Sequence, residues 1–545
     1  MSSGVKIRYG DVAPEAKENF VPSATDKESF VDLAQLQKYN LEFRNYANPC
    51  EYGSVLLDGN SVPFPDSPQS QNMGLWSKSL SGADGSFAEP IEITLTADGQ
   101  YSSQGITLTF DTYNDIFCNS LKIEWYRNDE QLESVNFQPN SPFYFCRKQV
   151  QNYDKVVITF NSLNMPHNRL KLRAIDYGYG TFLGRDELRN VSVIQEIDPI
   201  SSEIAINTVD FVLDSKSDME YSFQSKQPLS VYFNDNLIAT TFVKSSKRKS
   251  KRQWEVNSED YIGQLDKITF MGGMYKDKNI TELLSDMLTQ AKVPYSIDES
   301  LSDKTVTGYV PICTCREALM QMCFAVGAVA DTSNSAVLKV YVLSDSITQT
   351  VPLSRIRQGQ NFDDGERVTE VRVISHNYAE TDEQAELYRA ADSGTGEGIL
   401  VRFSEPMHTL SIRSGTVLSS GANYALIDAN AGCKLVGKKY ADNSVTVSKK
   451  NPVVSASDIE NVTEISNATL VSSDNADEVI ERCYDYLVKT NKVNLSVVET
   501  KTDTAINAGD TIAANTEYLG VVTGQVISVR YNLNGGIIVK ECVMV

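Results

Sequence analysis

Between residues 51 and 180, apolar and polar positions alternate in short runs that turn residues separate. Examples are PIEITLTADG (90–99), GITLTFD (105–111), SLKIEWYRNDEQ (120–131) and KVVITFN (155–161). An antiparallel β-sandwich typically shows alternation with a period of two, many β-branched residues, and Asp, Asn or Gly at regular intervals where the chain turns. We therefore predict a jelly-roll-like sandwich over residues 51–180. Residues 1–50 form a predicted N-terminal arm, in which FVDLAQLQKY (30–39) could form one short helix.

A second strand-rich segment follows the aromatic and glycine-rich stretch at 177–188. Residues 185–271 contain VSVIQEI, SEIAINTVDFVL and LDKITFM, and LSVYFNDNLIATTFV reads as a hairpin around residues 234–236. This pattern predicts a separate β domain over residues 185–271.

Two helices with clear start signals come next. Asn279 stands three residues before Glu282, and Thr314 stands three residues before Glu317. In this spacing the side chains can satisfy the free backbone N–H groups of the first helical turn. Each helix leads into a strand-like run, so we predict a small α/β domain over residues 272–345.

The remaining chain reads as a second β domain over residues 346–470 and a terminal domain over 471–545. The terminal domain begins with a helix at 474–490, which has acidic residues in its first turn. Strands and a hairpin at 534–536 then suggest a small C-terminal β-barrel. The predicted fold class is therefore mainly β and multidomain, with barrel-like domains and a small α/β insertion.

Composition narrows the classes of function. A length of 545 residues suggests roughly three or four domains. The 50 basic and 71 acidic residues give a net charge of −21, which disfavours nucleic acid and anionic membranes as partners. No run approaches the ~20 apolar residues of a membrane span, and the N-terminus lacks the apolar core of a signal peptide. The nine scattered cysteines suit reduced thiols, so we expect a soluble product of a cytoplasm.

Catalytic chemistry has little support. The chain has three histidines, His167, His376 and His408, and none is at metal-binding spacing from another. Cys313 and Cys315 lack the second ligand pair of a zinc site. The glycine-rich loop at 394–398 lacks the lysine of a phosphate-binding loop. We therefore expect no catalytic residue, no metal and no cofactor.

Two adjacent acidic pairs are the remaining candidates for catalysis. Asp363 with Asp364, or Asp477 with Glu478, could serve glycoside hydrolysis only if the two carboxyl groups faced one another across ~5–10 Å. Neighbouring acids in an acidic chain are more often solvated, which is the interpretation we adopt.

One basic run contrasts with the acidic chain. Six positive charges lie within nine residues: Lys244, Lys247, Arg248, Lys249, Lys251 and Arg252. One interpretation is a solvated hairpin tip before Trp254. The other is a docking site for an acidic neighbouring subunit, since charge contrast steers association and fixes its register.

Aromatic residues of the predicted sandwich offer a second candidate site. Trp76, Trp125 and Tyr126 could stack on sugar rings, with Asp84 supplying hydrogen bonds. The alternative is that these aromatics belong to the core. Trp125 and Tyr126 are adjacent on a strand, so they point to opposite faces and the sandwich can bury only one of them.

Two segments resemble known families. NMGLWSKSLSGADGSF (72–87), GITLTFD and SLKIEWY (120–126) resemble the galactose-binding-like, discoidin-type sandwich of carbohydrate-binding modules. SEDYIGQLDKITFMGGMYKDKNITELLSDMLTQAKVPYSID (258–298) and TGYVPICTCREALMQMCFAVGAVADTS (307–333) resemble tail hub proteins encoded by prophages of Gram-positive bacteria. The second resemblance spans roughly residues 185–345.

The resemblance to tail hubs implies a location in the virion, at the tail tip or baseplate. It implies a homotrimer in which residues 185–545 form a ring that closes the tail tube, with residues 1–180 outside it. The implied partners are the distal tail, tail tube, tape measure and tail fibre or spike proteins, and a cell-surface glycan for the sandwich. Two alternatives stay open: a cell-wall polysaccharide hydrolase with a carbohydrate-binding module, and a free lectin.

Overall fold

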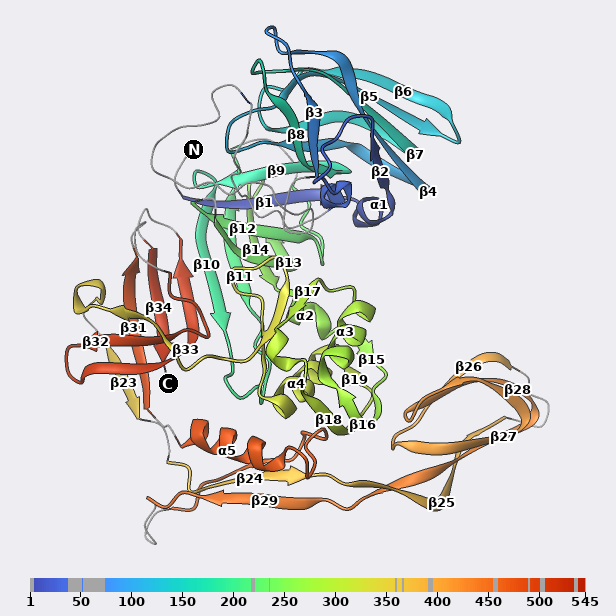
Figure 1. The fold of residues 1–545 in the computed structure, drawn as a ribbon, viewed down its shortest axis with the longest axis vertical. Helices are drawn as coiled ribbons and strands as arrows, with labels where there is room; N and C mark the ends of the chain where they lie inside the picture. The colour runs from blue at the N-terminus through green and yellow to red at the C-terminus, as the bar shows by residue number, and fades with distance from the viewer. Residues whose placement is uncertain are drawn as a thin grey trace. The chain divides into compact units, whose positions relative to one another are not determined.

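The computed structural model divides the chain into two compact units. The first comprises Met1–Arg189 and Phe211–Ser258, and the second comprises Asn190–Asp210 and Glu259–Val545. Both are built mainly from β-strands (Figure 1), which confirms the predicted mainly β, multidomain class. The described residues are 4–37, 51, 74–216, 221–234, 236–357, 360–364, 367–390, 396–453, 459–488, 491–499, 505–533 and 538–544.

The alternating runs of the N-terminal region form one antiparallel sheet in the first unit. Its strands are hydrogen-bonded in the order β3-β8-β4-β7-β5-β6, with β2 beside β4. The two long strands, β4 and β7, contain several register shifts, and such bulges bend a sheet. The bounds are β2 (Val21–Ala24), β3 (Leu75–Leu80), β4 (Ser86–Phe110), β5 (Cys118–Arg127), β6 (Glu130–Phe137), β7 (Phe143–Leu163) and β8 (Arg169–Asp176).

A single apolar cluster packs against the buried face of this sheet. Alternate positions of β4 and β5, such as Ile93, Leu95 and Ile123, belong to it and are fully buried. The helical turn η1 (Leu33–Gln37) adds Leu33 and Leu36, so part of the segment predicted as a short helix packs against the core. Burying one face of an alternating strand explains why the period of two was visible in the sequence.

A second set of strands in the first unit runs in the order β11-β14-β13-β12-β1-β9. Strand β1 pairs antiparallel with both β12 and β9, so part of the predicted N-terminal arm is an internal strand. The bounds are β1 (Val5–Val12), α1 (Pro14–Asn19), β9 (Gly178–Gly184), β11 (Thr208–Asp214), β12 (Pro228–Phe233), β13 (Asn236–Arg248) and β14 (Gln253–Glu259).

The structure differs from the predicted boundaries at residues 185–271. That segment is not one compact unit, because Phe211–Ser258 belongs to the first unit and Asn190–Asp210 to the second. Strand β10 (Leu188–Glu196) pairs with β33 (Gly520–Asn532), more than 300 residues later in the chain. Local pattern cannot reveal such long-range pairing, because the strands that pair are not neighbours in sequence.

The C-terminal strands of the second unit form an open sheet. Its order is β23-β31-β34-β33-β10, and β32 joins β33 to β22. Within the described residues no pairing connects β22 or β23 to β10, so the predicted C-terminal barrel is not closed. The predicted hairpin at 534–536 lies outside the described residues. The further bounds are β22 (Ile347–Val351), η4 (Leu353–Arg355), β23 (Asn361–Asp364), β31 (Asn491–Glu499), β32 (Thr511–Thr516) and β34 (Ile538–Met544).

The predicted α/β segment contains its two helices where the start signals placed them. Asn279 caps α3 by accepting from the N–H groups of Thr281 and Glu282, and Thr314 and Glu317 form a reciprocal capping box at α4. The bounds are α2 (Tyr261–Leu265), β15 (Thr269–Phe270), β16 (Gly273–Asn279), α3 (Ile280–Gln290), β17 (Tyr295–Ile297), η3 (Glu299–Leu301), β18 (Thr305–Val310), β19 (Cys313–Thr314), α4 (Cys315–Val326), β20 (Val329–Asp331) and β21 (Leu338–Tyr341).

The rest of the second unit is a helix on a small sheet and a long β extension. Helix α5 (Ala476–Leu487) confirms the predicted late helix and buries Val479, Ile480 and Cys483 in a cluster with Val371 and Val373 of β24. In Figure 1, β25 and β28 carry the chain away from this sheet. The bounds are β24 (Glu370–Ser375), β25 (Tyr378–Arg389), β26 (Gly396–Arg402), β27 (Met407–Ser420), β28 (Tyr424–Asp442), β29 (Val445–Lys450) and β30 (Val462–Ile465).

Candidate interaction sites

The two tryptophans predicted to stack on sugars are part of the core. Trp76 in β3 is 2% exposed and Trp125 in β5 is 0% exposed. A ring can stack on a glycan only from the solvent side, so the prediction for these two residues is wrong. Tyr126 points the other way from Trp125, as adjacent strand residues must, and remains partly exposed with the Lys155 ammonium 5.2 Å from its ring centre.

The remaining two residues of that predicted sugar site lie far apart. Asp84 is exposed in the turn before β4, where its Oδ1 accepts a hydrogen bond from the Ser86 N–H at 2.9 Å. Ser86 pairs with Ser162 of β7, whereas Tyr126 pairs with Lys155 of the same strand. Seven residues of strand separate those partners by roughly 20 Å. The structure therefore does not bring Asp84 and Tyr126 together.

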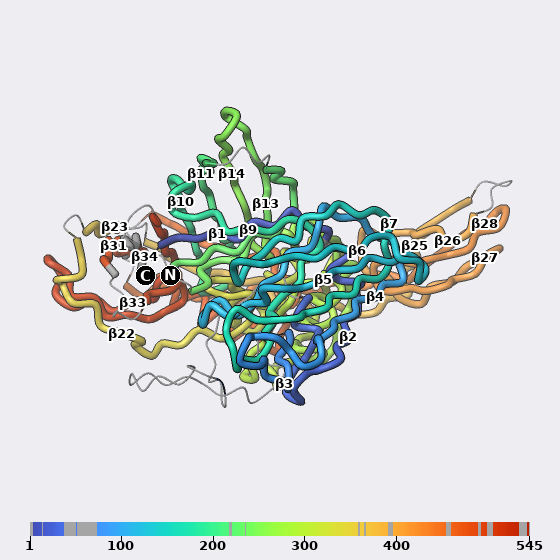
Figure 2. The backbone as a smooth tube through the Cα atoms, turned by 90° about the horizontal axis from the view of Figure 1, so that it is seen from above, coloured from blue at the N-terminus to red at the C-terminus, as the bar shows by residue number. Residues whose placement is uncertain are grey.

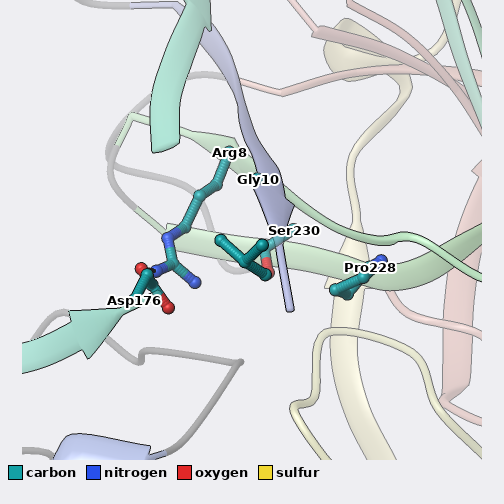
Figure 3. A pocket seen from close by; sticks show the side chains of 6 residues that line it. Arg8, Gly10, Asp176, Pro228 and Ser230 are labelled. Carbon is teal, nitrogen blue, oxygen red and sulfur yellow. Dashed lines mark hydrogen bonds and ion pairs between the residues drawn. The ribbon is translucent and has the colours of Figure 1, made fainter. Parts of the chain in front are cut away.

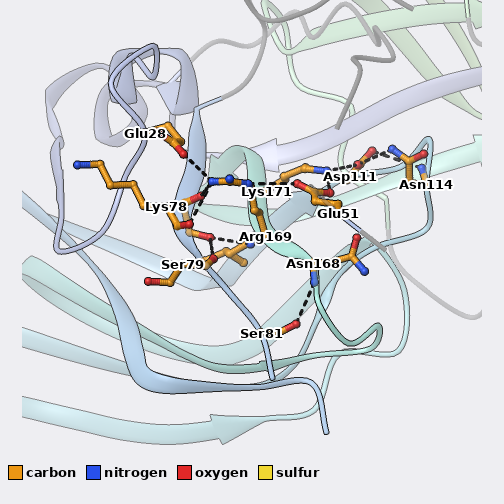
Figure 4. A network of polar contacts seen from close by, with 12 residues as sticks. Glu28, Glu51, Lys78, Ser79, Ser81, Asp111, Asn114, Asn168, Arg169 and Lys171 are labelled. Carbon is orange, nitrogen blue, oxygen red and sulfur yellow. Dashed lines mark hydrogen bonds and ion pairs between the residues drawn. The ribbon is translucent and has the colours of Figure 1, made fainter. Parts of the chain in front are cut away.

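A buried ionic network, which the sequence did not reveal, lies against Trp76. Lys171 of β8 places its ammonium 2.6 Å from Glu51 and 4.9 Å from the centre of the Trp76 ring. Asp111 lies 3.6 Å from Lys171 (Figure 4). It also lies 3.5 Å from Arg173. Burial opposes ionisation of Asp111, but these two cations outweigh it and hold its pKa below the usual value. The network is a structural feature of the sheet.

A second buried group of charges joins β8 to the N-terminal strand. Asp176 accepts from both Arg8 of β1 and Lys17 of α1, and all three side chains are buried. Burial disfavours the charged form of Asp176, yet Arg8 and Lys17 keep its pKa below normal. Figure 3 shows Arg8 and Asp176 facing one another beside Ser230, at a cavity of about 10 Å³. That volume suits one water molecule, so this is no ligand site.

The basic run occupies the tip of the β13–β14 hairpin. Residues 244–252 are all exposed, and Figure 2 shows the green tip of the hairpin reaching past the ends of neighbouring strands. Arg248 lies over the Trp254 ring at 5.0 Å, and Lys249 forms an ion pair with Glu255 at 2.6 Å. These contacts hold Arg248 and Lys249 against the hairpin itself.

An acidic pocket in the second unit was not predicted. It has a volume of about 610 Å³ and lies between the β17–η3 connection, β20–β21 and residues 507–510. Its lining contains one lysine, Lys339, and four carboxyl groups: Asp298, Glu299, Asp331 and Asp510. The Asn334 side chain donates to the Asn507 side chain at 2.8 Å, which ties two of the three walls together. The lining residues are too scattered in sequence to form a motif.

A buried carboxyl group lies close to this pocket. Asp260, the N-cap of α2, accepts from the Gly263 N–H at 3.1 Å and from the Thr332 hydroxyl at 2.6 Å. Burial raises the pKa of Asp260 to about 7, despite these hydrogen bonds. Burial also raises the pKa of Asp331, which accepts from the Ser333 hydroxyl at 2.6 Å. Two neighbouring carboxyl groups are therefore shielded from water.

Two acidic pairs were considered for hydrolysis. Asp363 and Asp364 are consecutive residues of β23. Asp477 and Glu478 are exposed in the first turn of α5, and Glu478 forms an ion pair with Lys304 at 2.9 Å. Consecutive side chains leave a helix in different directions, so the carboxyl groups of Asp477 and Glu478 do not face one another.

Cys313, Cys315 and His376 are the thiol and imidazole groups that were considered for catalysis or metal binding. Burial raises the pKa of Cys313 to about 12 and that of Cys315 to about 11, so both thiols stay protonated near neutral pH. His376 is buried rather than at the surface, and its Nδ1 lies 2.7 Å from Asp442. Nowhere in the described ranges are three or more His, Cys, Asp or Glu side chains arranged so that they could hold a metal ion. Among the same residues, no helix has the length and apolarity needed to cross a membrane.

Comparison with known proteins gave matches among solved structures. No protein-family model matches the chain, and no curated protein matches it. The 43 kDa tail protein of prophage MuSo2 from Shewanella oneidensis is 9% identical, with a TM-score of 0.43 over 66% of this chain and 97% of that one.

Two further solved structures have similar statistics. A tail protein from Neisseria meningitidis is 12% identical, with a TM-score of 0.41 over 66% of this chain and 95% of that one. A prophage tail protein from Listeria monocytogenes is 11% identical, with a TM-score of 0.39 over 67% of this chain and 91% of that one. The solved structures named here are thus tail proteins, and likenesses of this size do not by themselves assign a function.

Proposed function

We propose that this chain is a structural tail hub of a bacteriophage or phage-like particle, located at the tail tip or baseplate. The observation that carries the proposal is the segment that resembles tail hub proteins, residues 258–333. From Glu259 onward this segment lies in the second unit, and its helices α3 and α4 begin at the capping residues Asn279 and Thr314. The proposed hub forms a homotrimer that closes the tail tube.

The charge of the chain supports a role in a conduit. A net charge of −21 repels phosphate groups, so DNA could pass such a surface without adhering to it. The proposed neighbours are the distal tail, tail tube, tape measure and fibre or spike proteins. In this proposal the N-terminal sheet is a bracing or binding module outside the ring.

The geometry gives less support to the two alternatives. A polysaccharide hydrolase needs two carboxyl groups that face each other, and Asp477 and Glu478, consecutive on α5, do not have that arrangement. A glycan site built on Trp76 and Trp125 would need rings that water can reach, and both rings are buried.

The solution mass of the purified chain tests the proposal. Light scattering is expected to give a trimer, with three times the 60.4 kDa mass of the chain. A monomer at every accessible concentration would contradict the homotrimer. A monomer that also binds a glycan array would favour the lectin, because lectin function needs no self-assembly.

A further inference from the structure

We propose that the basic β13–β14 hairpin of one copy of this chain docks in the acidic pocket of a second copy. The proposal rests on the function proposed above and names the contact through which copies associate. Its two surfaces belong to different units of the fold, so the contact would be head-to-tail. Head-to-tail contacts generate rings when the rotation between copies closes.

The hairpin has the positive charge and the solvent exposure that docking in an acidic pocket requires. From Lys244 to Ser258 it carries six basic residues and a single acidic one, Glu255. Its tip is exposed throughout residues 244–252. Arg248 is also held by its own loop, because its guanidinium donates to the carbonyl oxygens of Ser250 at 3.2 Å and Lys251 at 3.0 Å. A tip that is ordered before binding loses less conformational entropy on docking.

The pocket has the opposite charge and a suitable size. Four carboxyl groups and one ammonium group line it, and its volume of about 610 Å³ lies within the range of about 300–1,000 Å³ that is usual for binding pockets. Asp331 is buried in the wall, and Asp298 and Glu299 lie at its exposed rim. A cation that enters would lie close to Asp331, where the attraction is stronger than in bulk water.

A second copy is the partner that local charge favours, because the basic hairpin of one copy complements the acidic pocket of another. Copies with a net charge of −21 repel one another over most of their surface. Association therefore requires a local contact of opposite charge, and the hairpin is the densest basic run in the sequence. Such contacts raise the association rate and fix the register of the two partners.

Substitutions in the β13–β14 hairpin test whether its positive charge is needed for docking. The variant Lys247→Glu/Lys251→Glu keeps Arg248 and Lys249, which are bound to the hairpin itself. We expect self-association at low ionic strength to weaken by about tenfold or more, measured by analytical ultracentrifugation. The matched control is Lys27→Glu/Lys78→Glu, which changes the net charge equally at two other exposed lysines and should leave association unchanged.

Substitutions in the acidic pocket test whether it receives the hairpin. Ser296→Lys/Glu299→Lys places two cations at the pocket, and both positions are exposed, so folding should be retained. Each variant alone should associate poorly. A chain that carries both sets of changes offers two introduced glutamates on the hairpin to two introduced lysines at the pocket, and it should recover part of its self-association. Loss of association without this recovery would overturn the proposed pairing.

Mixing the two variants separates contacts between copies from contacts within one chain. The hairpin of the pocket variant is intact, as is the pocket of the hairpin variant. An equimolar mixture should therefore recover self-association that neither variant shows alone, because intact hairpins meet intact pockets and altered hairpins meet altered pockets. If the hairpin variant remains a trimer, the docking proposal is wrong while the tail hub stands. If the wild-type chain forms only charge-sensitive pairs, docking stands and the trimeric hub is wrong.

Discussion

Asn207 and Asp260 form two hydrogen bonds with each other, and each residue donates one of them. The Asn207 N–H donates to Asp260 Oδ2 at 3.2 Å, and the Asp260 N–H donates to the Asn207 carbonyl oxygen at 3.0 Å. Residues 207 and 260 lie just before and just after the segment that belongs to the first unit. The Asn207 side chain also donates to the Thr332 hydroxyl at 3.0 Å. The points where the chain leaves and re-enters the second unit are thereby tied together.

This arrangement predicts that α2 becomes less stable as the pH rises through neutrality. Burial raises the pKa of Asp260 from 3.8 to about 7, so the folded state binds the proton more tightly than the unfolded state. The stabilisation is complete below pH 4 and is lost as the pH approaches 7 and above. A shift of this size corresponds to at most about 4 kcal/mol.

Native-state hydrogen exchange of residues 259–265 at pH 5 and pH 8 measures the effect. The Asp260→Asn variant has the same size and does not titrate, so it corrects for the intrinsic pH dependence of exchange. Relative to that variant, wild-type protection should fall between pH 5 and pH 8. Parallel behaviour of the two proteins would contradict the prediction.

Asp176→Asn is expected to destabilise the first unit by about 3–5 kcal/mol, because it leaves Arg8 and Lys17 buried without their counter-charge. Urea unfolding followed by tryptophan fluorescence measures this, since all three tryptophans, Trp76, Trp125 and Trp254, belong to the first unit. Asp186→Asn removes the partner of an exposed pair with Lys216 and serves as the control. It should leave the unfolding midpoint unchanged.

Replacing two adjacent residues of β5 should have unequal effects. Trp125→Ala removes a fully buried ring and is expected to cost about 3–5 kcal/mol. Tyr126→Ala removes a partly exposed ring and should cost roughly 1 kcal/mol or less. Urea unfolding followed by circular dichroism compares the two variants. Similar losses at both positions would mean that the strand does not bury one face as described.

Thr314→Ala should weaken the start of α4 by about 1 kcal/mol. The Thr314 hydroxyl accepts from the Glu317 N–H at 3.2 Å, and the Glu317 carboxylate accepts from the Thr314 N–H at 2.8 Å. Thr314→Ser keeps the hydroxyl and should retain most of the stability. Thermal unfolding of the three proteins, followed by circular dichroism, tests this order. A serine variant as unstable as the alanine variant would rule out capping as the cause.

Local features of the fold were predictable because short-range interactions produce them. The caps at Asn279 and Thr314 each depend on residues two or three positions apart. The opposite orientations of Trp125 and Tyr126 follow from strand geometry alone. Which of the two is buried was not predictable, because that depends on which face the apolar cluster covers. For the same reason Trp76, which lies beneath Lys171, was mistaken for a surface residue.

The sequence by itself determined the strand-rich class, the two capped helices, the acidic balance and the basic run at 244–252. These properties follow from composition and from spacings within one turn or one strand. Only the tertiary structure decided that β10 pairs with β33, that Asp111, Lys171 and Glu51 form a buried network, and that carboxyl groups from three separate segments line one pocket. The physical reason is that these contacts join residues tens to hundreds of positions apart. Burial of a shared core selects such contacts, and local propensity does not encode them.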